Sequence, residues 1–200
     1  MTMLQTWGIP IVISYLLGSI SFSYLLTKWL KGVDIRDYGS GNAGATNTSR
    51  VLGKGPALVV FLLDALKGMA AVGFGYWMAG NSPDVKLVMM VCGIAAIIGH
   101  NWPVFLGFRG GKGIATTVGV TCLIGFTAAV VAGICAILFI LFTRYVSVGS
   151  LVYTSIVPVM MWLLDYPTAV VWLMLIVSVM ALWRHKQNVI NLFKGNERKI

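Results

Sequence analysis

Long runs of apolar residues, separated by short polar segments, constrain this chain more than any other feature of its sequence. The core of a bilayer offers no hydrogen-bonding partner to a peptide group, so an apolar run of about 20 residues crosses it as a helix. Only 10% of the 200 residues are charged and 58% are hydrophobic, whereas about a quarter of a soluble domain is charged. The pattern predicts an all-α integral membrane protein with one membrane domain, residues 1–200.

The apolar runs divide into seven predicted transmembrane helices. The run from Ile114 to Phe142 is too long for one helix, and Gly125-Phe126-Thr127 predicts a tight reversal within it. Five spans are the alternative if some of the short runs are re-entrant. The predicted spans occupy approximately residues 7–30, 56–79, 85–99, 114–126, 128–143, 146–164 and 167–183.

The distribution of basic residues predicts the orientation in the membrane. The net charge is +9, but the cations form no continuous stripe with interleaved aromatic residues, which argues against nucleic acid as a partner. With seven spans, one side of the membrane carries the polar loops 31–55 and 100–113, Arg144 and the tail 184–200, while the other side shows only Lys86. Because cytoplasmic segments carry the excess of Lys and Arg, we expect the N-terminus outside and the C-terminus in the cytoplasm.

The first unusual polar segment is SGNAGATNTSR, from Ser40 to Arg50. Its glycines permit positive φ and close approach of a ligand to the backbone, and successive N–H groups in such a loop can hold an anion. The planar guanidinium of Arg50 suits a phosphate. The segment lacks the Gly-Lys-Ser/Thr ending of a P-loop, and an ordinary connecting loop is the alternative. The candidate ligand contacts are Ser40, Gly41, Asn42, Asn47 and Arg50.

The second segment, FRGGKG, places Arg109 and Lys112 around Gly110 and Gly111, just before a helix that is expected to begin near residue 114. The N-terminus of a helix offers unpaired N–H groups and a positive dipole end, which favour a phosphate. The alternative is that the two cations only anchor the helix at the lipid headgroups. Because two segments rich in glycine and cations lie on the same predicted side of the membrane, we favour a ligand site over headgroup anchors.

The third segment, RHKQNVINLFKGNE, contains His185 and Asn188, which would share one face of a helix. Near a phosphate site, His185 is a candidate general base or a group that orients a hydroxyl. Arg144 and Ser150 flank the start of a predicted span and could reach the same site. The alternatives are a headgroup anchor for Arg144 and a helix-start hydroxyl for Ser150.

Two further features favour structural roles. Asp64 and Lys67 lie three residues apart inside the second span, where ionisable groups are costly unless they compensate each other, so we expect a buried pair. His100 is followed at once by Asn101 and then Trp102-Pro103, which favours capping or packing. The three cysteines lie inside apolar runs and are expected to pack as small hydrophobic residues.

The remaining chemistry points to phosphate and hydroxyl groups. The acids on the predicted cytoplasmic side, Asp34, Asp37 and Glu197, are too scattered for a metal site, and we predict no metal and no cofactor. No carboxylate pair or nucleophile motif stands out. The polar segments offer Arg, Lys, Asn and His side chains and glycine N–H groups, which can hold phosphate oxygens and orient a hydroxyl. The neighbouring apolar helices could hold an acyl chain and contact membrane lipid.

These segments resemble a known family. Gly39–Asn47, Gly99–Gly113 and Arg184–Glu197 are similar to the three motifs of the bacterial membrane glycerol-3-phosphate acyltransferases of the PlsY type, and Leu62–Gly68 is similar to that family's second span. The match covers nearly the whole chain in order. The resemblance implies a seven-helix, multi-pass enzyme of the bacterial inner membrane with its active site on the cytoplasmic side.

The resemblance also implies a reaction. The acyl group would pass from acyl phosphate, rather than acyl-CoA or acyl carrier protein, to the sn-1 hydroxyl of glycerol 3-phosphate. The products would be 1-acyl-sn-glycerol 3-phosphate (lysophosphatidic acid) and phosphate, in the first acylation of phospholipid synthesis. A peripheral enzyme, PlsX, would supply the acyl phosphate.

Under this hypothesis Arg50, Lys112 and His185 are the catalytic residues. The His-x4-Asp pair of other glycerol-phosphate acyltransferases is absent, because the fifth residue after His100 is Phe105 and the fifth after His185 is Ile190. Either His185 or the acceptor's own phosphate, with its second pKa near 6, could take the hydroxyl proton.

Two other functions fit the sequence less well than an acyltransferase. A transporter of a phosphorylated metabolite should place cations near the middle of the membrane and often shows internal repeats, and neither is visible in the sequence. A phosphotransferase that uses a nucleotide-activated alcohol usually needs an Asp cluster for Mg²⁺, and the sequence shows no such cluster.

Overall fold

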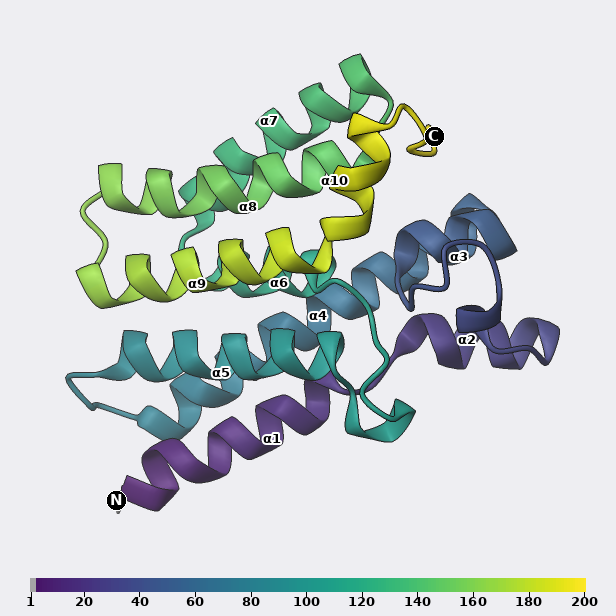
Figure 1. The fold of residues 1–200 in the computed structure, drawn as a ribbon. Helices are drawn as coiled ribbons and strands as arrows, with labels where there is room; N and C mark the ends of the chain where they lie inside the picture. Colours follow the sequence, from purple (N-terminus) through teal and green to yellow (C-terminus); the bar gives the residue numbers. More distant parts are fainter. Residues whose placement is uncertain (1–2) are drawn as a thin grey trace. The chain divides into compact units, whose positions relative to one another are not determined.

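The computed structural model describes residues 3–200, and no strand occurs among them (Figure 1). The all-α prediction is therefore confirmed for this range. The chain divides into two compact units, Met1–Ile124 and Gly125–Ile200.

In the first unit, α4 is the central helix and packs against α1, α5 and α6. Small residues bring these helices close together: a Cβ on Gly18 would collide with the backbone of Ala96 in α5, and one on Gly119 with the backbone of Ala65 in α4. The elements of the unit are the π-helical turn η1 (Leu4–Gly8), α1 (Ile9–Gly18), α2 (Phe22–Lys31), the 3₁₀ turn η2 (Ile35–Asp37), α3 (Ala45–Leu52), α4 (Lys54–Ala79), α5 (Val85–Asn101), the 3₁₀ turn η3 (Val104–Leu106) and α6 (Ile114–Ile124).

The first predicted span is broken rather than continuous. Helix α1 ends at Gly18, and Ser21 is extended, with φ −97° and ψ 96°, before α2 begins. The carbonyl oxygen of Ile20 accepts a hydrogen bond of 2.6 Å from Lys67 Nζ. A buried side chain of α4 therefore satisfies a backbone group at the break, as an apolar environment requires.

The two polar segments that were predicted as a loop and a tail contain helices. The loop 31–55 includes α3, which buries Asn47 and Thr48. The tail 184–200 includes α10 (Lys186–Phe193), which is bent by 57° from the helix before it. Both helices are short, and the polar composition of their segments leaves no clear helical spacing of apolar residues.

In the second unit, α7 packs against α8 and α8 against α9, with α10 continuing from α9 (Figure 1). Arg144, which ends α7, has a left-handed backbone with φ 67°. Helix α7 begins one residue after Gly125, where the reversal was predicted. The helices are α7 (Phe126–Thr143), α8 (Val146–Leu163), α9 (Thr168–Arg184) and α10.

Each predicted span contains an observed helix, but the predicted total of seven is not confirmed. Among the described residues, five segments are long and apolar enough to cross a membrane, or six if α9 and α10 count as one bent span. Helix α6 has 11 residues, about 17 Å at 1.5 Å per residue, little more than half of a hydrocarbon core of about 30 Å. The predicted orientation stays a prediction, and Met1 and Thr2 lie outside the described residues.

Two glycines of α4 test the close packing against α6. A Cβ on Gly68 would collide with the carbonyl oxygen of Thr116, whereas a Cβ on Gly73 would have no neighbour within 4 Å. We expect Gly68→Ala to lower the free energy of unfolding by about 1–3 kcal/mol, because a backbone atom cannot move aside. Gly73→Ala, on the same helix, should be neutral or stabilising by up to about 1 kcal/mol. Thermal unfolding in detergent measures both, and equal stability of the two variants would contradict the packing.

Candidate functional site

The buried side chain of Asn47 holds the first glycine-rich segment in shape. Its Oδ1 accepts a hydrogen bond of 2.9 Å from the Ser40 N–H, and its Nδ2 donates to the carbonyl oxygens of Ile35 at 3.1 Å and Tyr38 at 2.9 Å. Gly39 has φ +62°, and a Cβ there would collide with Asn47 Oδ1. Both amide donors of Asn47 are used on the backbone just before the segment, so the side chain shapes the loop.

The other candidates of the first segment lie closer to its surface. Ser40, Gly41 and Arg50 are exposed, and Asn42 is half-buried. Arg50 lies in the last turn of α3. These groups are placed where an anion in solution or at the membrane surface can reach them.

The second segment folds back onto the end of α5. The Gly111 N–H donates a hydrogen bond of 3.0 Å to the carbonyl oxygen of His100. A Cβ on Gly111 would collide with His100 Nε2 and would lie 2.6 Å from the carbonyl oxygen of Ala43. Gly111 therefore lies between the imidazole of His100 and the first segment, and the structure brings the first two segments together at this point.

The cations of the second segment are at its edges. Arg109 is exposed and Lys112 is half-buried, while Gly110 and Gly111 between them are buried. Lys112 lies two residues before α6, whose N-terminus was predicted as a phosphate site. The predicted helix start at residue 114 is confirmed.

Sequence analysis missed Asn101 as a candidate. Asn101 is fully buried at the end of α5, and its Oδ1 would lie 2.9 Å from a Cβ on Gly113, directly before α6. Within the described part of the chain, neither polar atom of its side chain has a hydrogen-bond partner, and neither does the buried hydroxyl of Thr116 in the first turn of α6. Unpaired buried polar groups are costly, so this place suits a polar ligand or ordered water. The sequence signal was the Asn next to His100.

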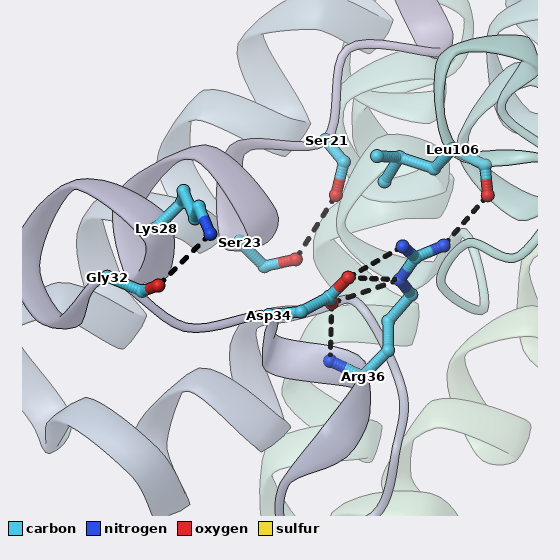
Figure 2. A network of polar contacts seen from close by, with 7 residues as sticks. All are labelled: Ser21, Ser23, Lys28, Gly32, Asp34, Arg36 and Leu106. Atoms are coloured by element: carbon cyan, nitrogen blue, oxygen red, sulfur yellow. Dashed lines mark hydrogen bonds and ion pairs between the residues drawn. The ribbon is translucent and has the colours of Figure 1, made fainter.

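An arginine links the stretches of chain that precede the two segments (Figure 2). Arg36 donates through Nε and Nη2 to the carboxylate of Asp34, at 3.0 and 2.6 Å, and through Nη1 to the carbonyl oxygen of Leu106 at 2.8 Å. Leu106 is in η3, directly before the second segment. The hydrogen bonds from Arg36 hold the pKa of Asp34 below its ordinary value, and the nearby charge of Arg109 lowers this pKa further.

The predicted pair inside α4 is confirmed. Lys67 Nζ is 2.8 Å from Asp64 Oδ1, and both side chains are buried. His100 Nδ1 lies 3.5 Å from the same carboxylate oxygen. His100 is itself buried, in agreement with the packing role expected for it.

The third segment lies in the second unit. His185, at the junction of α9 and α10, is 2% exposed, and its Nδ1 lies 2.8 Å from the carbonyl oxygen of Ala181. A carbonyl oxygen only accepts, so Nδ1 donates the proton. In the neutral imidazole, Nε2 is then the nitrogen that carries the basic lone pair.

Glu197 holds this segment to the first turn of α8, and it was not among the predicted site residues. One oxygen, Oε1, accepts hydrogen bonds from Asn188 Nδ2 at 2.7 Å and from Ser147 Oγ at 2.8 Å. The single acid looked isolated in the sequence because its partners lie 9 and 50 residues away.

The structure gives Arg144 and Ser150 contacts within the second unit. The guanidinium of Arg144 donates to the carbonyl oxygen of Ile200, at 3.2 Å from Nε and 2.8 Å from Nη2. Ser150 Oγ donates to the carbonyl oxygen of Val146 at 2.9 Å, the bond of a hydroxyl in the first turns of a helix. That all three segments meet in one pocket stays a prediction.

The ion pair of Asp34 and Arg36 predicts a dependence of stability on pH. An unfolded Asp has a pKa of about 3.9, and the folded value is lower because of Arg36. The pair therefore stabilises the protein above that unfolded value, and this contribution is lost as the pH falls through the folded pKa. We expect Arg36→Gln to lower the unfolding temperature at about pH 6, with a difference from the wild type that shrinks below about pH 4.

Thermal unfolding in detergent, from about pH 6 down to about pH 3, is the measurement. Lys28→Gln is the matched control, because Lys28 Nζ donates to the carbonyl oxygen of Gly32, a group that does not titrate (Figure 2). Its difference from the wild type should not change over this pH range. A pH-independent difference for Arg36→Gln would contradict the assignment.

Comparison with known proteins agrees with the motifs. The family model described as "Glycerol-3-phosphate acyltransferase" matches residues 8–195. The glycerol-3-phosphate acyltransferase of Shouchella clausii (strain KSM-K16) is 48% identical, over 95% of this chain and 94% of its own length. That of Halalkalibacterium halodurans is 50% identical, over 94% of this chain and 92% of its own length.

A solved structure gives the same result. The crystal structure of PlsY, an integral membrane glycerol 3-phosphate acyltransferase, in its glycerol 3-phosphate form has a TM-score of 0.88 and 36% identity, over 96% of this chain and 94% of PlsY. The resemblance of the three segments is thereby confirmed, and this chain belongs to the family of integral membrane glycerol-3-phosphate acyltransferases of the PlsY type.

Proposed function

We propose that this acyltransferase takes its acyl group from acyl phosphate and transfers it to the sn-1 hydroxyl of glycerol 3-phosphate. The products are 1-acyl-sn-glycerol 3-phosphate and inorganic phosphate. The observation that carries the proposal is the contact of the two glycine-rich segments where Gly111 meets the carbonyl oxygen of Ala43, since these are the segments that carry Arg50, Arg109 and Lys112. PlsY itself has been crystallised in glycerol 3-phosphate and lysophosphatidic acid forms.

The first unit supplies the groups that hold phosphate. Arg50, Arg109 and Lys112 offset the charge of two phosphorylated substrates, which would otherwise repel each other, and they stabilise the phosphate as it leaves. The backbone N–H groups at the start of α6 add donors that need no side chain. The buried amide of Asn101, without a partner in the described residues, is suited to a polar atom of the substrate.

The reaction needs no covalent intermediate on the enzyme. The sn-1 oxygen attacks the carbonyl carbon of the acyl phosphate, the bond from that carbon to the phosphate oxygen breaks, and the hydroxyl proton passes to a base. Acyl phosphate is a mixed anhydride, so phosphate departs with its bonding electrons without prior activation by a nucleophilic side chain.

We assign the base to His185. Its Nδ1 donates to the carbonyl oxygen of Ala181, an arrangement that fixes the ring and makes Nε2 the nitrogen that accepts a proton. Asn188, held by Glu197, orients the hydroxyl or the imidazole. The alternative base is the phosphate of the acceptor itself, whose second pKa is near 6.

We further propose the location of this chemistry. The enzyme spans the bacterial inner membrane seven times, with the N-terminus outside and the basic segments in the cytoplasm. Water-soluble glycerol 3-phosphate then reaches the site from the cytosol, while the acyl chain lies among the helices. A peripheral enzyme that makes acyl phosphate, PlsX, is the proposed supplier of the donor.

A comparison of donors tests the proposed reaction. Purified enzyme in lipid receives glycerol 3-phosphate with palmitoyl phosphate, palmitoyl-CoA or palmitoyl-acyl carrier protein. We expect product only from palmitoyl phosphate, with one phosphate released for each lysophosphatidic acid formed. Lys112→Ala should lower kcat/KM by at least about a hundredfold, as loss of a charge-stabilising group does. Lys86→Ala, a cation outside the motif segments, is the matched control. Equal rates with palmitoyl-CoA would overturn the choice of donor.

Kinetics of His185→Ala separate the two bases. If His185 takes the proton, kcat should fall by about 10²–10⁴-fold while KM for glycerol 3-phosphate changes much less. Lys186→Ala changes the next residue, so it is the matched control for a disturbance of the junction between α9 and α10. A His185→Ala variant that keeps most of its kcat and raises KM would assign binding to His185 and proton removal to the acceptor phosphate.

A further inference from the structure

Three ionisable side chains are buried together in the first unit, apart from the cations of the motif segments, which are exposed or half-buried. Asp64 and Lys67 lie on α4 and are 1% and 3% exposed, and His100 at the end of α5 is 6% exposed. Asp64 Oδ1 is 2.8 Å from Lys67 Nζ and 3.5 Å from His100 Nδ1. The reaction proposed above uses none of the three.

Stability alone does not account for this cluster. Taking an ion pair out of water costs several kcal/mol per ion, and apolar replacements of similar volume are often equally stable or more stable. Lys67 has a structural contact, since it satisfies the Ile20 carbonyl oxygen at the break between α1 and α2. That contact explains the buried donor, and Asp64 compensates the charge of Lys67, but neither contact explains the buried histidine beside them.

His100 connects the cluster to the glycine-rich segments. Its Nδ1 edge faces Asp64, and its Nε2 edge lies against Gly111, where a Cβ would collide with it. The carbonyl oxygen of His100 accepts the Gly111 N–H. The position of the imidazole therefore sets where the backbone of Gly111 lies, and Gly111 is the residue in contact with Ala43 of the first segment.

We propose that Asp64, Lys67 and His100 form a positioning network that fixes the Gly110–Lys112 segment and thereby sets the affinity for glycerol 3-phosphate. Lys67 neutralises and orients the Asp64 carboxylate, the carboxylate attracts the imidazole across 3.5 Å at its Nδ1 edge, and the imidazole supports Gly111. The three residues act through the loop and touch no substrate. This inference rests on the phosphate-binding role assigned to that segment under the proposed function.

Kinetics of two single variants and their combination test the network. In Asp64→Asn the amide no longer attracts the imidazole as a carboxylate does, and His100→Phe keeps an aromatic ring but loses the polar edge. For each we expect KM for glycerol 3-phosphate to rise at least about tenfold with kcat little changed, the pattern of lost ground-state binding. Because both act through one contact, the double variant should resemble the single ones instead of multiplying their effects.

A purely structural role predicts a different pattern. It would lower the unfolding temperature and leave KM of the folded enzyme unchanged, and the effects of the two substitutions would add. Thr121→Val is the matched control: it removes a buried hydroxyl from α6, which bonds to the carbonyl oxygen of Thr117, and should leave KM unaltered. Wild-type KM in both single variants, or additive effects in the double variant, would overturn the network.

An apolar pair can replace the ion pair if Asp64→Asn does not fold because Lys67 is left uncompensated. Asp64→Leu combined with Lys67→Met removes both charges, but the Ile20 carbonyl oxygen then loses its donor, so this variant should fold with a lower unfolding temperature than the wild type and show the same rise in KM. Glycerol 3-phosphate also raises the unfolding temperature of an enzyme that binds it, and this readout needs no acyl donor. A wild type that shows this rise but does not use palmitoyl phosphate refutes the proposed donor alone. If glycerol 3-phosphate raises the unfolding temperature of the variants as much as that of the wild type, the network alone is refuted.

Discussion

The need to satisfy backbone groups away from water controls the structure of this chain. Where a helix breaks or ends inside the first unit, a polar side chain or another backbone group supplies the missing partner: Lys67 donates to the Ile20 carbonyl oxygen, and the Gly111 N–H donates to that of His100. In hydrocarbon an unsatisfied carbonyl costs several kcal/mol. At these two places the chain leaves the helical path, and the polar partner lies there.

The same constraint explains how much of the fold could be predicted. Apolar length marks helices well, because only a helix satisfies its own backbone, and α4, α5, α7 and α8 begin or end within about two residues of the predicted spans. Helix α3 was not predicted, and α10 was expected only as the helix face shared by His185 and Asn188, since the stability of both depends on contacts that a polar sequence does not reveal. The number of crossings could not be predicted either, because Ile114–Ile124 is apolar but too short by itself to span the bilayer.

For the site, residue type predicted chemistry better than it predicted contacts. Glycines and cations marked the two segments that meet at Ala43 and Gly111. However, Asn47 looked like a ligand contact and instead turns inward to hold Ser40 and Tyr38. An amide in a loop has the same appearance in a sequence whether it faces a ligand or the backbone. Asn101 was overlooked for the opposite reason, because its lack of partners is visible only once its burial is known.

The distribution of carboxylates completes the electrostatics of the site. Asp34 is paired with Arg36 and Asp64 with Lys67, while Glu197 accepts from two neutral groups, Ser147 and Asn188. In the first unit, Asp34 and Asp64 are each neutralised by their own cation. They therefore weaken the positive electrostatic potential at the glycine-rich segments only slightly. An uncompensated carboxylate near a phosphorylated substrate would oppose its binding, and a carboxylate paired with its own cation does so much less. Under the proposed reaction, the remaining cations of the motif segments are then left to hold phosphate.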